Sequence, residues 1–187
     1  MRAKVNLVLL GVLVTCWGAT SLAEPEASLD PQAPATARLA SLEDAFAADH
    51  GDSGAARQLA DEYLARSRPR LAVSVLSAAP PALREDPAIL HRLARGYEET
   101  GRIDDALATA RLARARCARA LGTADASTVT PVPAQSCSER TYAALDMHVA
   151  ALGHMDRWGV TDVQHDDRAR QAYIRAVRSA RIVSAAR

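Results

Sequence analysis

Residues 86–115, DPAILHRLARGYEETGRIDDALATARLARA, contain the signals for two helices joined by a short turn. Asp86 belongs to the residue types that cap helix N-termini, and Pro87 is well tolerated in a first helical turn. Gly101 predicts the end of the first helix, and acidic residues then open the second helix, where the helix dipole favours them. The first helix carries its apolar residues at helical spacing, on one face: Leu90, Leu93, Ala94 and Tyr97. The stretch therefore predicts a helical hairpin.

A weaker copy of this hairpin precedes it in the chain at an offset of 34 residues. The matching residues are Leu59, Ala60, Tyr63, Ala72 and Ala79, which recur as Leu93, Ala94, Tyr97, Ala106 and Ala113. Alanine makes up roughly a fifth of the chain, so the Leu and Tyr matches carry most of the weight. The offset and the order of Leu, small residue, Tyr and two further small residues resemble the tetratricopeptide repeat family, best over residues 53–120.

This resemblance implies an all-α fold, a short right-handed stack of about three helical hairpins with an N-terminal capping helix. We expect the capping helix at 36–50, hairpins at 53–86 and 87–120, a loop at 121–137 and a third hairpin at 138–187, all in one domain spanning 36–187. The first hairpin departs from the repeat pattern at Ser67, which replaces the turn glycine. Ser136 and Glu139 form a capping box before the third hairpin, and Gly159 marks its turn.

The N-terminus has the composition of a bacterial secretory signal peptide over residues 1–23. Arg2 and Lys4 precede an apolar run, and Ser21 and Ala23 are the small residues of a cleavage site that predicts processing after Ala23. Residues 24–35 then form a proline-rich linker. These features predict a periplasmic or secreted protein. Two alternatives stay open, an uncleaved membrane anchor and a lipid-modified Cys16.

Two cysteines, Cys117 and Cys137, follow the predicted signal peptide. An even number of cysteines in an oxidising compartment predicts one disulfide, which would stabilise the fold by about 3 kcal/mol through a loop of this length. The alternative is a reactive thiol pair, but the spacing typical of redox motifs is absent.

Charge and motifs argue against several functions. The net charge is +1, and removing Arg2 and Lys4 with the signal peptide changes it to −1. This near-neutral value argues against a nucleic-acid partner. We find no catalytic or cofactor-binding motif and predict neither an enzyme nor a cofactor. His148 and His154 are six residues apart, a spacing that places them on different sides of a helix, so no metal site is predicted.

The predicted function is therefore binding of a protein or peptide. In the tetratricopeptide family the first helix of each hairpin lines a concave groove, and a common use of that groove holds a peptide carboxylate with Lys and Asn. The matching places hold Asp61 and Arg95 here, which predicts a different ligand type. Residue-by-residue transfer selects as the candidate groove Arg57, Asp61, Leu64, His91, Arg95 and Glu98.

A second function competes with this one. If the N-terminal segment stays in the membrane, the protein becomes an envelope-associated structural protein whose final helix contacts an anionic surface. That helix is predicted over 166–185, with basic residues opposite its apolar stripe. They are Arg168, Arg170, Arg175, Arg178 and Arg181.

Overall fold

The computed structural model describes residues 34–123 and 137–185, and all regular elements within these ranges are helical. The all-α prediction is thus confirmed for the described residues. In chain order they are α2 (Pro34–Ala48), α3 (Ser53–Ala65), α4 (Pro69–Ala78), the 3-10 turn η1 (Leu83–Glu85), α5 (Pro87–Glu99), α6 (Ile103–Thr123), α7 (Glu139–Arg157) and α8 (Asp167–Ala185). Contacts divide the chain into Met1–Arg38 and Leu39–Arg187, and the packing described below is that of the second unit.

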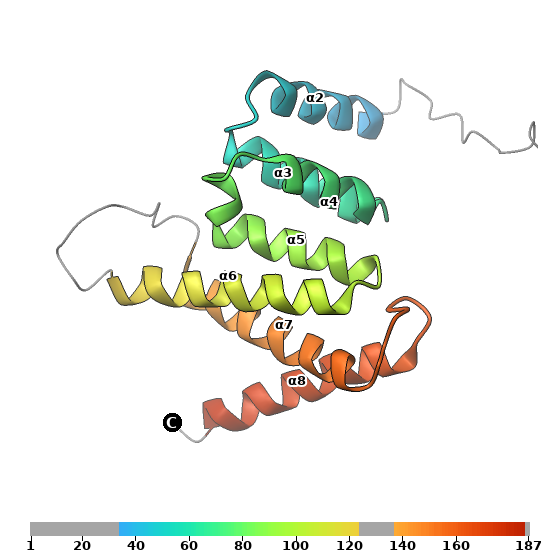
Figure 1. The fold of residues 1–187 in the computed structure, drawn as a ribbon, viewed down its shortest axis with the longest axis vertical. Helices are drawn as coiled ribbons and strands as arrows, with labels where there is room; N and C mark the ends of the chain where they lie inside the picture. The colour runs from blue at the N-terminus through green and yellow to red at the C-terminus, as the bar shows by residue number, and fades with distance from the viewer. Residues whose placement is uncertain (1–33, 124–136, 186–187) are drawn as a thin grey trace, which may run out of the picture. The chain divides into compact units, whose positions relative to one another are not determined.

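From α3 to α8, consecutive helices run back and forth, and each packs against the next (Figure 1). Helix α3 also contacts α5, so these two helices lie side by side. Because α3, α5 and α7 run in the same direction, the connections that follow them lie on the same side of the helices (Figure 1). This side brings together turns that are far apart in the sequence.

Two helices begin elsewhere than predicted. Helix α2 starts at Pro34, inside the predicted linker, because proline fits the first turn of a helix. Helix α7 starts at Glu139, and its cap is Ser138, whose side chain accepts a hydrogen bond from the Thr141 N–H at 3.1 Å. The predicted cap, Ser136, lies outside the described residues. For α5 the expected cap is present, since the Asp86 carboxylate accepts the Ala88 N–H at 2.8 Å.

Helices α3, α5 and α7 end in the same way, with a residue in the left-handed conformation. These residues are Ser67, Gly101 and Gly159, with φ values of 55°, 76° and 62°. After α5, the N–H of Arg102 donates to the carbonyl oxygen of Tyr97 at 2.9 Å, the bond that defines a Schellman motif. The same pattern follows α3 and α7. Ser67 thus performs the role of the missing glycine, at some conformational cost.

Two hydrophobic cores share α5. The first is built from α2 to α5 and includes Leu59, Leu76 and Ile89; the second is built from α5 to α8 and includes Leu152 and Met155. All of these side chains are buried. Helix α5 gives Ile89 to the first core and other residues to the second, so the two halves of the unit are joined through it.

Small residues lie where helices approach closely. At Gly96 of α5, an added Cβ would lie 2.7 Å from Cγ2 of Val73 in α4, closer than packed carbons allow. The repeated alanines are likewise all buried: Ala60, Ala72, Ala79, Ala94, Ala106 and Ala113. Their small side chains permit the close approach that a larger residue would prevent.

The predicted disulfide is confirmed. Cys117 of α6 is bonded to Cys137, which precedes α7, and their Cα atoms lie 5.5 Å apart, a common separation for such a bond. Cys117 is fully buried and contacts Leu90 and Leu145 in a small apolar cluster. The bond therefore attaches the end of α6 to the start of α7.

Candidate functional site

The predicted groove residues lie on α3 and α5. Across these helices, Arg92 of α5 makes a two-pronged ion pair with Asp61 of α3. Its Nε and Nη2 donate to Oδ1 and Oδ2 at 2.9 and 2.6 Å. Such paired geometry fixes both side chains and suits the planar guanidinium. Arg92 was not among the predicted residues, and it leaves Asp61 engaged within the chain.

The other predicted residues range from exposed to buried, with Arg57 and His91 half-buried. Arg57 donates from Nε to its own helix, to the Ser53 carbonyl oxygen at 3.0 Å. The side chain of Arg95 is 47% exposed, and its Nη2 reaches the Glu99 carboxylate at only 3.5 Å. Leu64 and Glu98 are buried. The surface offered by the predicted set therefore consists of Arg57, Arg95, the engaged Asp61 and part of His91.

Glu98 is the centre of a buried polar cluster that joins three helices. Tyr173 of α8 donates from its hydroxyl to Oε1 of Glu98 at 2.7 Å, and Nε2 of His148 in α7 lies 2.9 Å from Oε2. Glu98 and His148 are 5% and 3% exposed. Burial, together with the adjacent negative charge of Glu98, raises the pKa of Tyr173 far above its usual value, so its hydroxyl stays protonated. The cluster thus supplies two donors to a carboxylate shielded from water.

His91 lies next to this cluster, with its ring centroid 5.2 Å from that of His148. Burial lowers the pKa of His91 to about 4, and electrostatic interactions with His148, Arg95 and Arg92 add to the effect, while Glu98 opposes it. The His91 ring is therefore neutral at pH 7. Nδ1 of His148 is buried without a hydrogen-bond partner among the described residues.

Sequence reasoning missed this cluster because its members are 50 and 75 residues from Glu98. The one available signal was local, since Glu98 follows Ala94 by one helical turn and so shares its buried face. His154, which the sequence placed on another side of α7, does point elsewhere. Its Nδ1 lies 2.9 Å from Nη2 of Arg157.

A groove, here named the turn-side groove, lies where the connections after α3, α5 and α7 meet. It has a volume of about 620 Å³ and is lined by residues 67–71, 99–101 and 161–165. A Cβ added at Gly101 would overlap the carbonyl oxygen of Thr161, so only glycine allows the α5–α6 turn to approach the α7–α8 loop this closely. Sequence analysis did not predict this groove.

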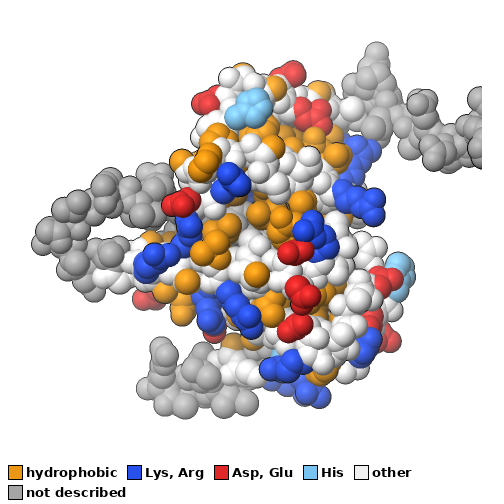
Figure 2. All heavy atoms as spheres, viewed as in Figure 1, with side chains coloured by type: hydrophobic (Ala, Val, Ile, Leu, Met, Phe, Trp, Pro, Cys, Tyr) orange, Lys and Arg blue, Asp and Glu red, His pale blue; other side chains and the backbone are white. Residues whose placement is uncertain are grey.

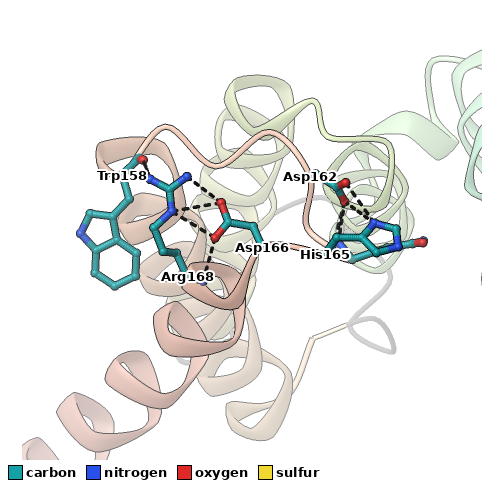
Figure 3. A network of polar contacts seen from close by, with 6 residues as sticks. Trp158, Asp162, His165, Asp166 and Arg168 are labelled. Carbon is teal, nitrogen blue, oxygen red and sulfur yellow. Dashed lines mark hydrogen bonds and ion pairs between the residues drawn. The ribbon is translucent and has the colours of Figure 1, made fainter.

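The α7–α8 loop is held by two sets of polar contacts (Figure 3). At one end, Asp162 Oδ1 accepts the N–H groups of Gln164 and His165 at 3.1 Å each, and its Oδ2 lies 3.0 Å from Nδ1 of His165. The hydrogen bond with the His165 side chain is the main reason that the pKa of Asp162 is lowered. At the other end, Arg168 donates to the Trp158 carbonyl oxygen and to Asp166, both at 2.6 Å. This wall of the groove is therefore fixed at both ends.

The opposite wall is basic and partly apolar. Arg68 and Arg70 are exposed, and no carboxylate pairs with either of them within the described ranges. Figure 2 shows basic side chains projecting beside the α3–α4 turn. Pro69 lies between the two arginines in the sequence, and Leu71, which is 43% exposed, follows Arg70 on the same lining. Residues 99–101 form the remaining part of the lining, and burial raises the pKa of the Glu99 carboxyl group there.

Two classes of feature are absent from the described residues. In the part of the chain that the structure describes, no three His, Cys, Asp or Glu side chains are grouped so as to hold a metal ion. Among helices within residues 34–123 and 137–185, none has the length and hydrophobicity needed to span a bilayer. The predicted signal peptide lies outside these ranges.

Comparisons with protein-family models, curated proteins and solved structures give no match to this chain.

Proposed function

We propose that this protein is an exported, non-catalytic scaffold of tetratricopeptide-like hairpins that binds a protein or peptide on the face of α3 and α5. The observation that carries the proposal is the pair of basic side chains, Arg57 and Arg95, on these neighbouring helices. Neither forms an ion pair across the helices, whereas Asp61 and Arg92 hold the same two helices together. Available charge on a braced surface is suited to steering and orienting a partner.

The helical arrangement supports the tetratricopeptide-like part of the proposal. Each hairpin packs against the next, and α3 contacts α5 as the first helices of adjacent repeats would. The residues that match at an offset of 34 include alanines that are all buried. The polar groups of Glu98, His148 and Tyr173 contact one another across α5, α7 and α8. This arrangement accords with a structural role for the cluster.

The contacts of α8 give less support to the membrane-associated alternative. Two of its arginines are engaged within the chain. Arg168 contacts Asp166 and Trp158, and the guanidinium carbon of Arg175 lies 5.0 Å from the centroid of the Trp158 ring. Cell fractionation distinguishes the alternatives, because the scaffold should be recovered in the soluble periplasm or medium, whereas the alternative should sediment with membranes.

The scaffold is tested by crosslinking in cells followed by mass spectrometry. Replacing Arg57→Glu and Arg95→Glu together should reduce recovery of the crosslinked partners at least tenfold. Arg170→Glu on α8 is the control, because Arg170 is an exposed arginine, as Arg95 is. Thermal unfolding of all variants should be similar, since exposed charges contribute little to stability. Equal recovery with the double variant and the control would refute this binding face.

A further inference from the structure

The turn-side groove is preformed, which lowers the entropic cost of binding. Left-handed residues terminate the helices on two of its segments, and Gly101 packs directly against the Thr161 carbonyl group. Asp162 and Arg168 hold the loop that forms the far wall. A ligand would therefore meet a shape that already exists.

The lining of the groove contains two arginines and two acidic residues, and only the acidic side chains have polar partners among the described residues. Asp162 accepts backbone and imidazole N–H groups of its own loop, and Glu99 makes one long contact of 3.5 Å with Arg95. Arg68 and Arg70, by contrast, have no carboxylate partner within residues 34–123 and 137–180. Guanidinium groups bind carboxylates strongly because their donors match the geometry of two oxygens.

The groove also has apolar surface next to these charges. In the part of the chain that the structure describes, Leu71 is one of the few large apolar side chains that are substantially exposed, and Pro69 and Val163 are half-buried on the same lining. A volume of about 620 Å³ is within the range of sites that hold short ligands. A ligand with only negative charge would leave this apolar surface in water.

We propose that the turn-side groove binds an extended, acidic peptide segment of another protein, with an apolar residue next to its carboxylates. The carboxylates pair with Arg68 and Arg70, and the apolar side chain packs on Leu71 and Val163. The groove lining includes neither Arg57 nor Arg95, although its Glu99 contacts Arg95. The proposal therefore goes beyond the function proposed above, and variants of Arg57 and of Arg68 with Arg70 distinguish the failure of one from the failure of the other.

The test uses the purified protein and an array of synthetic hexapeptides in three sets. One set alternates acidic and apolar residues, the second alternates basic and apolar residues, and the third contains only acidic and uncharged polar residues. The protein should bind members of the first set, bind them at least tenfold more weakly at high salt, and bind the other two sets much less.

Variants then locate the binding. Arg68→Glu with Arg70→Glu, and separately Leu71→Ser, should each weaken binding of the selected peptides at least tenfold. Arg57→Glu on the α3–α5 face and Arg170→Glu on α8 should not, and circular dichroism should show that every variant is folded. The proposal is overturned if no first-set peptide binds, or if the groove variants bind as the controls do. It is equally overturned if the purely acidic set or inorganic phosphate competes fully, since the site would then recognise charge alone.

Discussion

Glu98 is a carboxylate placed among helices rather than in water, and its two partners come from the last two helices of the chain. A buried ionisable group of this kind costs free energy to desolvate, and its hydrogen bonds offset that cost only while all of them are formed. Its removal leaves the hydroxyl of Tyr173 and the ring of His148 buried without their acceptor. The cluster is thus a point at which three helices depend on one another.

We therefore expect Glu98→Ala to lower the free energy of unfolding by about 3 kcal/mol, the typical cost of leaving a buried polar partner alone. Tyr173→Phe removes one hydrogen bond and keeps the ring, so it should cost about 1 kcal/mol. Urea unfolding followed by circular dichroism measures both changes. Equal, small losses for the two variants would show that the carboxylate does not hold the cluster together.

His91 makes stability depend on pH. Its pKa in the folded protein is about 4, below the ordinary value of 6.5, so the unfolded chain binds a proton in this interval that the folded chain does not. Stability should consequently fall as the pH is lowered from 6.5 to 4, by on the order of 2 kcal/mol for this partly exposed ring. Comparing urea unfolding of the wild type and His91→Gln across that interval isolates the contribution. Parallel curves for the two proteins would contradict it.

Local signals in the sequence were sufficient for part of this structure. The Asp86 cap, the turn at Gly101 and the Cys117–Cys137 pair involve neighbouring residues or a small number of candidates. The Glu98 cluster and the turn-side groove were not predictable, because their parts meet only when separate hairpins pack. Ser67 departs from the repeat pattern in the sequence, so the pattern gave no sign that this turn forms part of a groove. In the structure, Ser67 ends α3 in the left-handed conformation, directly before Arg68.

At the scale of elements, two helical glycines differ in how closely a neighbouring helix approaches them. Gly96 of α5 faces Val73 of α4 with no room for a Cβ, whereas a Cβ at Gly153 in α7 would meet no atom within 4 Å. Both glycines lie inside helices, where glycine weakens the helix relative to alanine. The two positions therefore share one backbone effect and differ in packing.

This difference predicts opposite signs for the same substitution. Gly153→Ala should stabilise the protein by about 0.5–1 kcal/mol through helix propensity. Gly96→Ala should destabilise it by about 1–2 kcal/mol, because the added methyl group would clash with Val73 of α4. The free-energy cost of this clash exceeds the gain in helix propensity. Urea midpoints give both values. Stabilisation by Gly96→Ala would mean that α4 and α5 are farther apart than described.

At the scale of the whole folded unit, α5 belongs to both hydrophobic cores and the disulfide ties α6 to α7. The covalent bond lies within the second half of the unit, beside Leu90 of the shared helix. Disruption there should reach the first core as well, because α5 contributes Ile89 to it. Unfolding is accordingly expected to be a single cooperative transition.

Replacing both cysteines, Cys117→Ala and Cys137→Ala, should lower the free energy of unfolding by about 3 kcal/mol, the amount expected for a bond between residues this far apart. Thiol titration provides the direct check. Denatured, non-reduced protein lacking residues 1–23 should have no free thiol, and two per chain would contradict the bond.

The bond between Cys117 and Cys137 also determines what a protease leaves behind. A cut in the backbone anywhere between them would produce two fragments that remain attached through sulfur. Such a clipped protein would migrate as one band on a non-reducing gel and as two after reduction. Because the disulfide would still join α6 and α7 beside their packed surfaces, the cleaved protein should retain its fold. It should therefore also retain the binding surfaces that this fold presents.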